Sequence, residues 1–126
     1  MHLHLLIFIS LLAGFRQIDS QYTSTIEWLT PMEHDFGDLP QGQAITYHFE
    51  YKNLSEEPLV IDNVRPSCGC TAPDWSLVPT NTGETGKLKI VFDAKKEGYF
   101  RKKIKVYFNQ LRKAEVLYVE GYVEYE

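Results

Sequence analysis

Apolar and polar residues alternate with a period of two over most of the chain, which is the pattern of half-buried β-strands. The clearest run covers residues 44–53, where one face of the strand carries Ile45, Tyr47, Phe49 and Tyr51. Similar runs cover residues 59–64, 87–93, 98–108 and 114–125, and turn-forming residues separate them. No run of normal helix length shows a helical period. The pattern predicts short antiparallel strands.

Each of these runs has one apolar face that we expect to be buried. The later inward residues are Leu88, Ile90, Phe92, Phe100, Ile104, Val106, Phe108, Leu117, Val119, Val123 and Tyr125. The basic residues Arg101, Lys102, Lys103 and Lys105 are interpreted as a solvated outer face that could also protect a sheet edge. Residues 21–31 read either as an ordered edge strand or as a loose lead-in.

Strand length and spacing together predict an all-β fold. Short strands every 8 to 12 residues or so, in about 100 residues, are typical of an immunoglobulin-like antiparallel β-sandwich of about seven strands. Trp75 follows the two cysteines closely, so the Cys, Trp, Cys spacing of antibody domains is absent. We therefore expect no disulfide between the sheets, and stability must come from apolar burial, at about 25 cal/mol per Å².

The N-terminus has the character of a targeting segment. Residues 3–15 are almost wholly apolar, and they are too few to cross a bilayer core of about 30 Å. We assign residues 1–20 to a signal peptide cleaved after Ser20, with Gly14 as the second choice, and residues 21–126 to one domain. No cysteine lies directly after the apolar run, where a lipid would be attached, so we expect an exported protein, periplasmic or secreted, with no membrane anchor in the mature chain.

Composition and charge narrow the classes of function. The 126 residues include 13 Lys plus Arg against 17 Asp plus Glu, a net charge of −4. With a pI near 5.6, the chain offers no basic field for nucleic acid or for an anionic membrane. A content of 44% apolar and 13% aromatic residues predicts a packed fold. No nucleophile motif, P-loop or dinucleotide fingerprint is present, which indicates a non-enzymatic protein.

The most specific feature is the run Arg-Pro-Ser-Cys-Gly-Cys-Thr at residues 65–71. Chemistry leaves three states open for Cys68 and Cys70: a local disulfide, two free thiols, or two thiolate ligands for a soft metal. Export favours oxidation, and a disulfide across one residue closes a small, readily reduced ring. A fourth interpretation is that both cysteines only fill space as small apolar groups.

The neighbours of the cysteines complete the candidate site. Gly69 suits a positive or otherwise unusual backbone dihedral, and Thr71 is expected to hydrogen-bond the loop backbone. Cys68 and Cys70 are weak candidates for Cu(I), whereas a closed zinc site needs four ligands. His34 and His48 have no ligand spacing to them, and we expect both histidines at the surface. We predict no cofactor.

Several motifs resemble those of the domain of unknown function 1573 family. They are Phe36-Gly37-Asp38, residues 49–53, the run Ser-Cys-Gly-Cys-Thr at residues 67–71, and then Gly86, Ile90, Phe92 and Asp93. The resemblance covers about residues 33–108. It implies an exported bacterial protein with an immunoglobulin-like fold, of a kind common in Bacteroidetes, and it implies no established activity.

Two functions follow as hypotheses. The first is a non-enzymatic binding or structural module of the cell envelope, which meets another envelope or extracellular protein through its surface or through a free strand edge. The alternative is a thiol redox or Cu(I)-binding protein that acts through Cys68, Gly69, Cys70 and Thr71.

Overall fold

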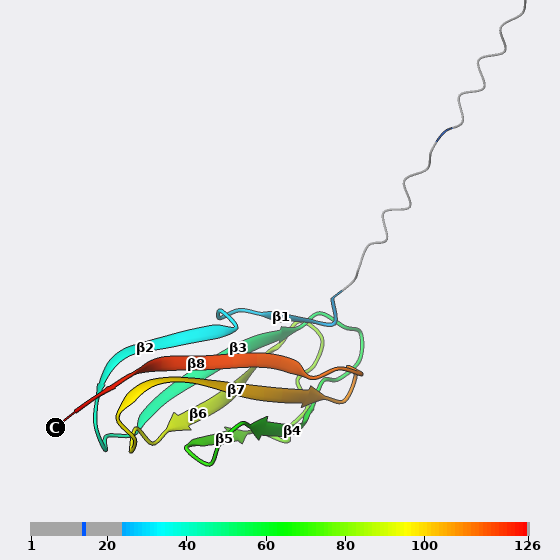
Figure 1. Cartoon of the computed structure of the whole chain (residues 1–126). Coiled ribbons are helices and arrows are strands. Elements are labelled where there is room, and N and C mark those ends of the chain that lie inside the picture. The colour runs from blue at the N-terminus through cyan, green and yellow to red at the C-terminus, as the bar shows by residue number, and fades with distance from the viewer. Residues whose placement is uncertain (1–13, 15–23, 126) are drawn as a thin grey trace, which may run out of the picture.

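Eight strands form two facing sheets in the computed structural model, which describes residue 14 and residues 24–125 (Figure 1). The predicted signal peptide, residues 1–20, lies outside the described residues apart from Gly14. Within residues 24–125 the structure has no helix with the length and apolarity needed to cross a membrane.

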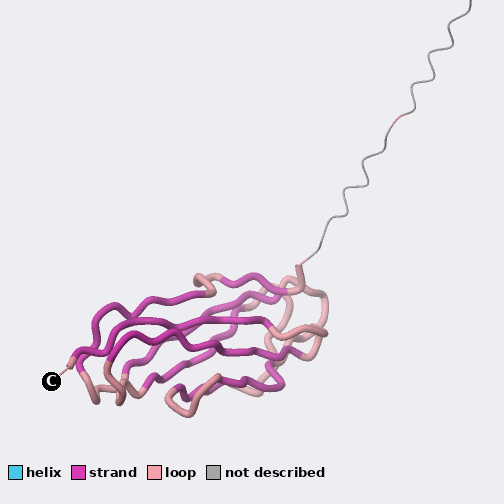
Figure 2. The backbone as a smooth tube through the Cα atoms, in the orientation of Figure 1, coloured by secondary structure: helices cyan, strands magenta, loops and turns pink. Residues whose placement is uncertain are grey.

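The strands divide equally between the sheets. Their bounds are β1 (Ile26–Trp28), β2 (Glu33–Pro40), β3 (Ile45–Asn53), β4 (Ile61–Pro66), β5 (Thr71–Trp75), β6 (Thr85–Phe92), β7 (Gly98–Phe108) and β8 (Glu115–Glu124). One sheet has the order β1-β3-β6-β5 and is called here the β3 sheet; the other, β2-β8-β7-β4, is the β7 sheet. Figure 2 shows that the described chain consists of strands joined by loops and turns. The all-β sandwich is confirmed, with one strand more than seven, and the pairing is antiparallel except between β2 and β8.

The core lies between the sheets and uses the alternation read from the sequence. Its fully buried side chains come from both inner faces and include Phe49, Leu88, Ile90, Ile104, Val106, Leu117, Val119 and Val123. The prediction for Tyr125 is wrong, because β8 ends at Glu124 and the Tyr125 side chain is 79% exposed. Edge protection by the basic strand is also wrong, because β7 lies between β8 and β4.

Strands β2 and β5 were not visible in the pattern, for local reasons. The ladder of β2 shifts register between Asp35 and Asp38, where Gly37 has a positive φ of 69°, so its alternation is broken. Strand β5 is five residues long and contains Pro73. The lead-in segment contains an ordered edge strand, β1, which pairs with the end of β3.

An aromatic pair closes the core at the end that carries the loops β4–β5 and β6–β7. The rings of Phe92 on β6 and Phe100 on β7 stack with centroids 3.9 Å apart and planes 18° apart. Gly121 on β8 makes this possible, because a Cβ there would lie 2.9 Å from Cζ of Phe100 and 2.9 Å from the carbonyl oxygen of Gly37. The absence of a side chain at this buried position sets where Phe100 lies.

We expect Gly121→Ala to lower the free energy of unfolding by about 1–3 kcal/mol, since the added methyl group overpacks Phe100 and the Gly37 carbonyl. Denaturant unfolding of the variant measures the loss. Gly69→Ala is the matched control, because a Cβ at Gly69 meets nothing within 4 Å. Equal stability of the two variants would show that the space beside Phe100 is not constrained as described.

Candidate functional site

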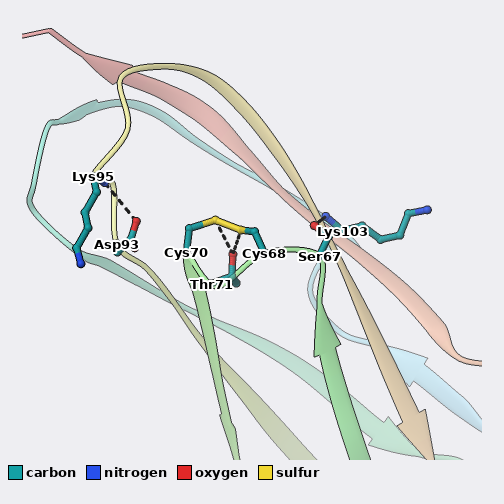
Figure 3. The surroundings of a disulfide bond; sticks show 7 residues. All are labelled: Ser67, Cys68, Cys70, Thr71, Asp93, Lys95 and Lys103. Carbon is teal, nitrogen blue, oxygen red and sulfur yellow. Dashed lines mark hydrogen bonds between the residues drawn. A yellow bond between two sulfur atoms is a disulfide. The ribbon is translucent and has the colours of Figure 1, made fainter.

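The cysteine loop carries the chain from one sheet to the other, from the end of β4 to the start of β5 (Figure 3). Cys68 and Cys70 form a disulfide with their Cα atoms 5.3 Å apart, which is one of the three states that the sequence left open. The loop is tied to both sheets: Ser67 N donates to the Lys103 carbonyl at 2.9 Å, and Asp93 N donates to the Cys70 carbonyl at 3.0 Å. Backbone hydrogen bonds on both sides thus hold the disulfide in place.

Thr71 turns its hydroxyl group toward the disulfide. The side chain is 2% exposed, and Oγ1 lies 3.7 Å from Sγ of Cys68 and 3.8 Å from Sγ of Cys70. The expected bond from this hydroxyl to the loop backbone is replaced by these contacts with sulfur; the backbone N–H of Thr71 meets the Cys68 carbonyl instead, at 3.5 Å. Gly69 is not among the residues with positive φ, so of the two expected alternatives, a positive or an otherwise unusual dihedral, the positive one is wrong.

A cavity of about 310 Å³ adjoins the disulfide. Both cysteines line it, the rings of Phe92 and Phe100 lie at its core side, and Tyr99 borders it. Four charged residues complete the lining: Asp93, Lys96, Glu97 and Lys102. The disulfide therefore borders a partly enclosed space that can receive an apolar group.

The two acids of the cavity already have partners, whereas the two lysines do not. Asp93 Oδ1 accepts the Lys95 backbone N–H at 3.2 Å, and Glu97 Oε2 accepts from Gln41 Nε2 at 3.1 Å. In the described part of the chain neither Lys96 nor Lys102 forms an ion pair. These hydrogen bonds leave both carboxylates charged, so the lining carries two positive and two negative groups, and an anion formed beside the disulfide would be stabilised by the lysine that lies nearest to it.

Lys102 is the functional candidate that the sequence interpretation missed. It was assigned to an outer face, but it lies on the core side of β7, half-buried, between the inward positions of Phe100 and Ile104. The signal was in the alternation, because the period that places Phe100 and Ile104 inward also places Lys102 inward. A lysine at a core-facing position of a central strand carries a desolvation cost that an apolar residue would avoid, which makes Lys102 a candidate for a functional role.

The disulfide closes too small a loop to stabilise the fold strongly. Its cysteines are two positions apart in sequence. In the chain-entropy description, a loop of three residues or so corresponds to about 1.6 kcal/mol, against about 3 kcal/mol for a 15-residue loop. The sandwich therefore does not depend on this bond.

The histidines lie away from the cysteine loop, and one of them is not a surface residue. His34 is half-buried on β2, and its ring stacks on Tyr47 with centroids 3.5 Å apart. Burial lowers the pKa of His34 below its ordinary 6.5, and the charge of Asp35 opposes the shift. His48 is exposed, as expected. No cluster of three or more His, Cys, Asp or Glu residues suited to a metal occurs within residues 24–125.

The edge strand β4 is closed to strand addition by side chains of β4 itself and of β5. Register places the backbone of Ile61, Val64 and Pro66 on the side away from β7. The Ile61 carbonyl accepts from Trp75 Nε1 at 3.0 Å, the Val64 N–H donates to Asn63 Oδ1 at 2.9 Å, and Pro66 has no N–H. These contacts leave few groups for a partner strand.

Strand β5 is protected in a similar way. Pro73 occupies a position whose backbone faces away from β6, so that position offers no donor at the edge. On the opposite side of the sandwich, β1 pairs with β3 only from Tyr51 to Asn53. Leu29 and Thr30 still form hydrogen bonds with Glu50. From Glu50 toward the start of β3, the unpaired edge is short, and the side chains on its outer face are polar. The edges formed by β4, β5 and β1 with β3 are therefore a poor basis for partner binding.

The outer face of the β7 sheet is rich in tyrosine and arginine. Its strands β7, β8 and β4 present Tyr99, Tyr107, Tyr118, Tyr122, Arg65 and Arg101. The arginines lie over tyrosine rings: the Arg101 guanidinium carbon is 4.1 Å from the Tyr118 centroid, and that of Arg65 is 5.3 Å from the Tyr107 centroid. Tyr99 and Tyr122 are opposite each other in register and are 66% and 49% exposed.

The outer face of the β3 sheet has a different composition. Register and alternation place there Glu27, Thr46, His48, Glu50, Lys52, Ala72, Asp74, Lys87, Lys89 and Val91. These described positions include no tyrosine, tryptophan or arginine. Tyrosine and arginine are the residues enriched at binding interfaces, so the two faces of the sandwich are not equivalent.

Charge is also unevenly distributed over the β7 sheet. Arg101 pairs with Glu33 at 2.8 Å and with Glu120 at 3.4 Å, which neutralises the side toward β2. On the other side Arg65 lies directly opposite Lys105 in register. Two like charges in this position repel each other and destabilise the pairing of the strands. Arg65, Lys103 and Lys105 form no ion pair with a described residue, and they surround a shallow hollow of about 330 Å³.

Comparison with known proteins identifies a family and a fold. The sequence profile of DUF1573, a protein family of unknown function, matches residues 26–123. No curated protein sequence matches the chain. The matched range includes the cysteine loop and extends the expected range of residues 33–108 at both ends.

Solved structures share the architecture at low sequence identity. A protein of unknown function from Porphyromonas gingivalis W83 is similar with a TM-score of 0.67 and 17% identity, over 78% of this chain and 46% of that chain. The PapD-like domain 7 of human CEP192 gives a TM-score of 0.68 and 10% identity, over 82% and 88%. WR4, an MSP family member of C. elegans, gives 0.51 and 12%, over 80% and 99%. These likenesses show a PapD-like, immunoglobulin-like fold, and the chain spans less than half of the Porphyromonas protein.

The first prediction of the site concerns pH. Unfolded His34 takes up a proton near pH 6.5 and folded His34 only at lower pH, so its contribution to stability is present above pH 6.5 and is lost as the pH falls below it. We expect His34→Phe, which keeps an aromatic ring, to flatten the dependence of the unfolding free energy on pH between 7.5 and 5.5 or so. His48→Gln is the control and keeps the wild-type slope. Identical slopes for wild type and His34→Phe would contradict the burial of His34.

The second prediction concerns the disulfide. Replacing Cys68 and Cys70 together by serine should leave the protein folded and lower the unfolding free energy by no more than about 1.6 kcal/mol, because the closed loop is so short. Denaturant unfolding under oxidising conditions measures the change. A loss above about 3 kcal/mol, or an unfolded variant, would identify the bond as a structural staple.

Proposed function

This chain belongs to the DUF1573 family, and we propose that it is an exported, non-enzymatic module that binds another protein of the cell envelope through the outer face of its β7 sheet. The observation that carries the proposal is the tyrosine and arginine content of this face. The guanidinium groups of Arg101 and Arg65 lie over the rings of Tyr118 and Tyr107, and Tyr99 and Tyr122 are exposed on the same face. Rigid amphipathic side chains of this kind lose little entropy on binding.

The charge of the face specifies the chemistry of the partner. Arg65, Lys103 and Lys105 repel one another and lack carboxylate partners in the described chain. Carboxylates of a partner protein that enter the hollow beside Tyr107 would relieve this repulsion. The net charge of −4 argues against a nucleic acid or an anionic membrane as the binding partner. The favoured occupant is therefore a protein surface rich in Asp and Glu.

Export is proposed from the apolar segment at the N-terminus, whose length suits a secretory signal better than a membrane span. A non-enzymatic role is proposed because the exposed residues of the β7 sheet serve contact better than chemistry. Closure of the β4 and β5 edges favours binding by a face over addition of a strand.

The test compares two charge-reversal variants of the full chain in capture from envelope extracts. Lys103→Glu with Lys105→Glu alters the proposed face. Lys87→Glu with Lys89→Glu makes the same change of charge at the same spacing on the outer face of the other sheet. We expect a partner that the wild type and the Lys87/Lys89 variant retain equally, and that the Lys103/Lys105 variant binds at least about tenfold more weakly, with affinity falling as salt rises.

Thermal unfolding first confirms that both variants are folded. The identified partner is then purified, and its dissociation constant is measured with each variant. If both charge-reversal variants bind the partner equally weakly, the attraction between the partner and this protein is electrostatic but not specific to one face. Loss confined to the Lys87/Lys89 variant would place binding on the β3 sheet. Either result overturns the proposal.

A further inference from the structure

We propose that the Cys68–Cys70 disulfide exchanges with the thiols of a dithiol-containing partner, and that Lys102 stabilises the thiolate that exchange produces. Three independent observations meet at this point. The disulfide borders a cavity of about 310 Å³, a core-facing lysine lines the same cavity without an ion pair among the described residues, and the Thr71 hydroxyl lies within 3.8 Å of both sulfurs. None of the three is needed to close the corner of a sandwich.

The surroundings of the two sulfurs distinguish their roles. Both cysteines are half-buried, but only Cys70 packs against the buried core. Figure 3 shows the disulfide at the tip of its loop, with the Thr71 hydroxyl beneath both sulfurs and the Lys103 side chain directed away from them. An incoming thiolate therefore reaches Cys68 Sγ more readily, and Cys70 is the leaving sulfur.

The exchange step conserves atoms and electrons. A partner thiolate attacks Cys68 Sγ, a new sulfur–sulfur bond forms, and the Cys68–Cys70 bond breaks with its electron pair passing to Cys70 Sγ. The second thiolate of the partner then attacks the partner's sulfur in this mixed disulfide. The partner's own disulfide forms, and Cys68 is released as a thiolate. In total two electrons pass from the partner dithiol, which becomes a disulfide, to the Cys68–Cys70 pair. The two protons of the partner dithiol go to solvent or to the new thiolates.

The cavity supplies what a leaving thiolate requires. The Thr71 hydroxyl can donate to it, and the Lys102 ammonium group compensates its charge. The other charged groups of the lining are Asp93, Lys96 and Glu97; the two carboxylates oppose a thiolate, and the ammonium group of Lys96 offsets one of them. Phe92 and Phe100 provide an apolar surface for the residue that flanks the attacking cysteine.

The experiment measures reduction of the disulfide in the folded full chain by dithiothreitol, an uncharged dithiol that can complete both steps. Lys102→Met removes the proposed charge, and Lys103→Met removes one from the adjacent, outward position. Because a leaving thiol of higher pKa leaves more slowly, we expect Lys102→Met to slow reduction by about threefold. Lys103→Met should react at the wild-type rate.

A second measurement excludes a merely structural effect. Alkylation of the reduced proteins by iodoacetamide across pH gives the thiol pKa, which we expect Lys102→Met to raise by about one unit and Lys103→Met to leave unchanged. Thr71→Val, which removes the hydroxyl and keeps the shape, should slow reduction as Lys102→Met does.

The outcomes that overturn the inference are equally definite. It fails if Lys102→Met and Lys103→Met have the same rates and the same thiol pKa. It also fails if the folded protein is reduced at least about a hundredfold more slowly than a Ser-Cys-Gly-Cys-Thr peptide disulfide, since the bond would then be inaccessible to a partner.

Discussion

The stacking of Phe92 on Phe100 joins the two sheets at the end where the chemistry lies. One ring belongs to β6 and the other to β7, so the contact fixes the separation of the sheets at this end. Gly121 leaves space behind Phe100, and Thr71 lies opposite Phe92 in register. The cysteine loop is seated on this aromatic pair, and the same two rings form part of the adjoining cavity. This end of the core therefore also forms one wall of the cavity beside the disulfide.

The alternation of apolar residues was sufficient to predict the sandwich and most of its long strands. Strand β7 was predicted at its observed bounds because its inward residues repeat without interruption except at Lys102. Strands β2 and β5 were missed, since a register shift at Asp35 and a proline at position 73 break the period on which the prediction rests. Local irregularity of this kind depends on tertiary contacts that a periodic pattern does not contain.

The candidate site was predicted in part. Cysteine spacing located the loop, because no strand pattern explains two cysteines around a glycine. The role of Lys102 required the structure, since a run of basic residues on a strand reads as a solvated face until the inward and outward positions are fixed. The contact of Thr71 with both sulfurs and the burial of His34 also depend on long-range packing.

The proposed binding face and the cavity meet at Tyr99. This residue lies opposite Tyr122 on the outer face of the β7 sheet, and it also lines the cavity beside the disulfide. Its hydroxyl donates to Glu120 at 2.8 Å, and this hydrogen bond raises the pKa of Tyr99. A protein held on the face would lie next to Cys68 and Cys70. One partner can therefore both bind to the outer face of the β7 sheet and exchange thiols with the disulfide, although the two proposals rest on different residues.

The most direct test of this account is the equilibrium reduction potential of the Cys68–Cys70 pair, measured in the folded chain against glutathione redox buffers with mass spectrometry as the readout. An exchanging disulfide should lie in the range of known exchange proteins, from about −270 to −120 mV. A potential below about −300 mV, typical of structural disulfides, would contradict the central claim that the cysteine loop is a chemical site on a fold that does not need it.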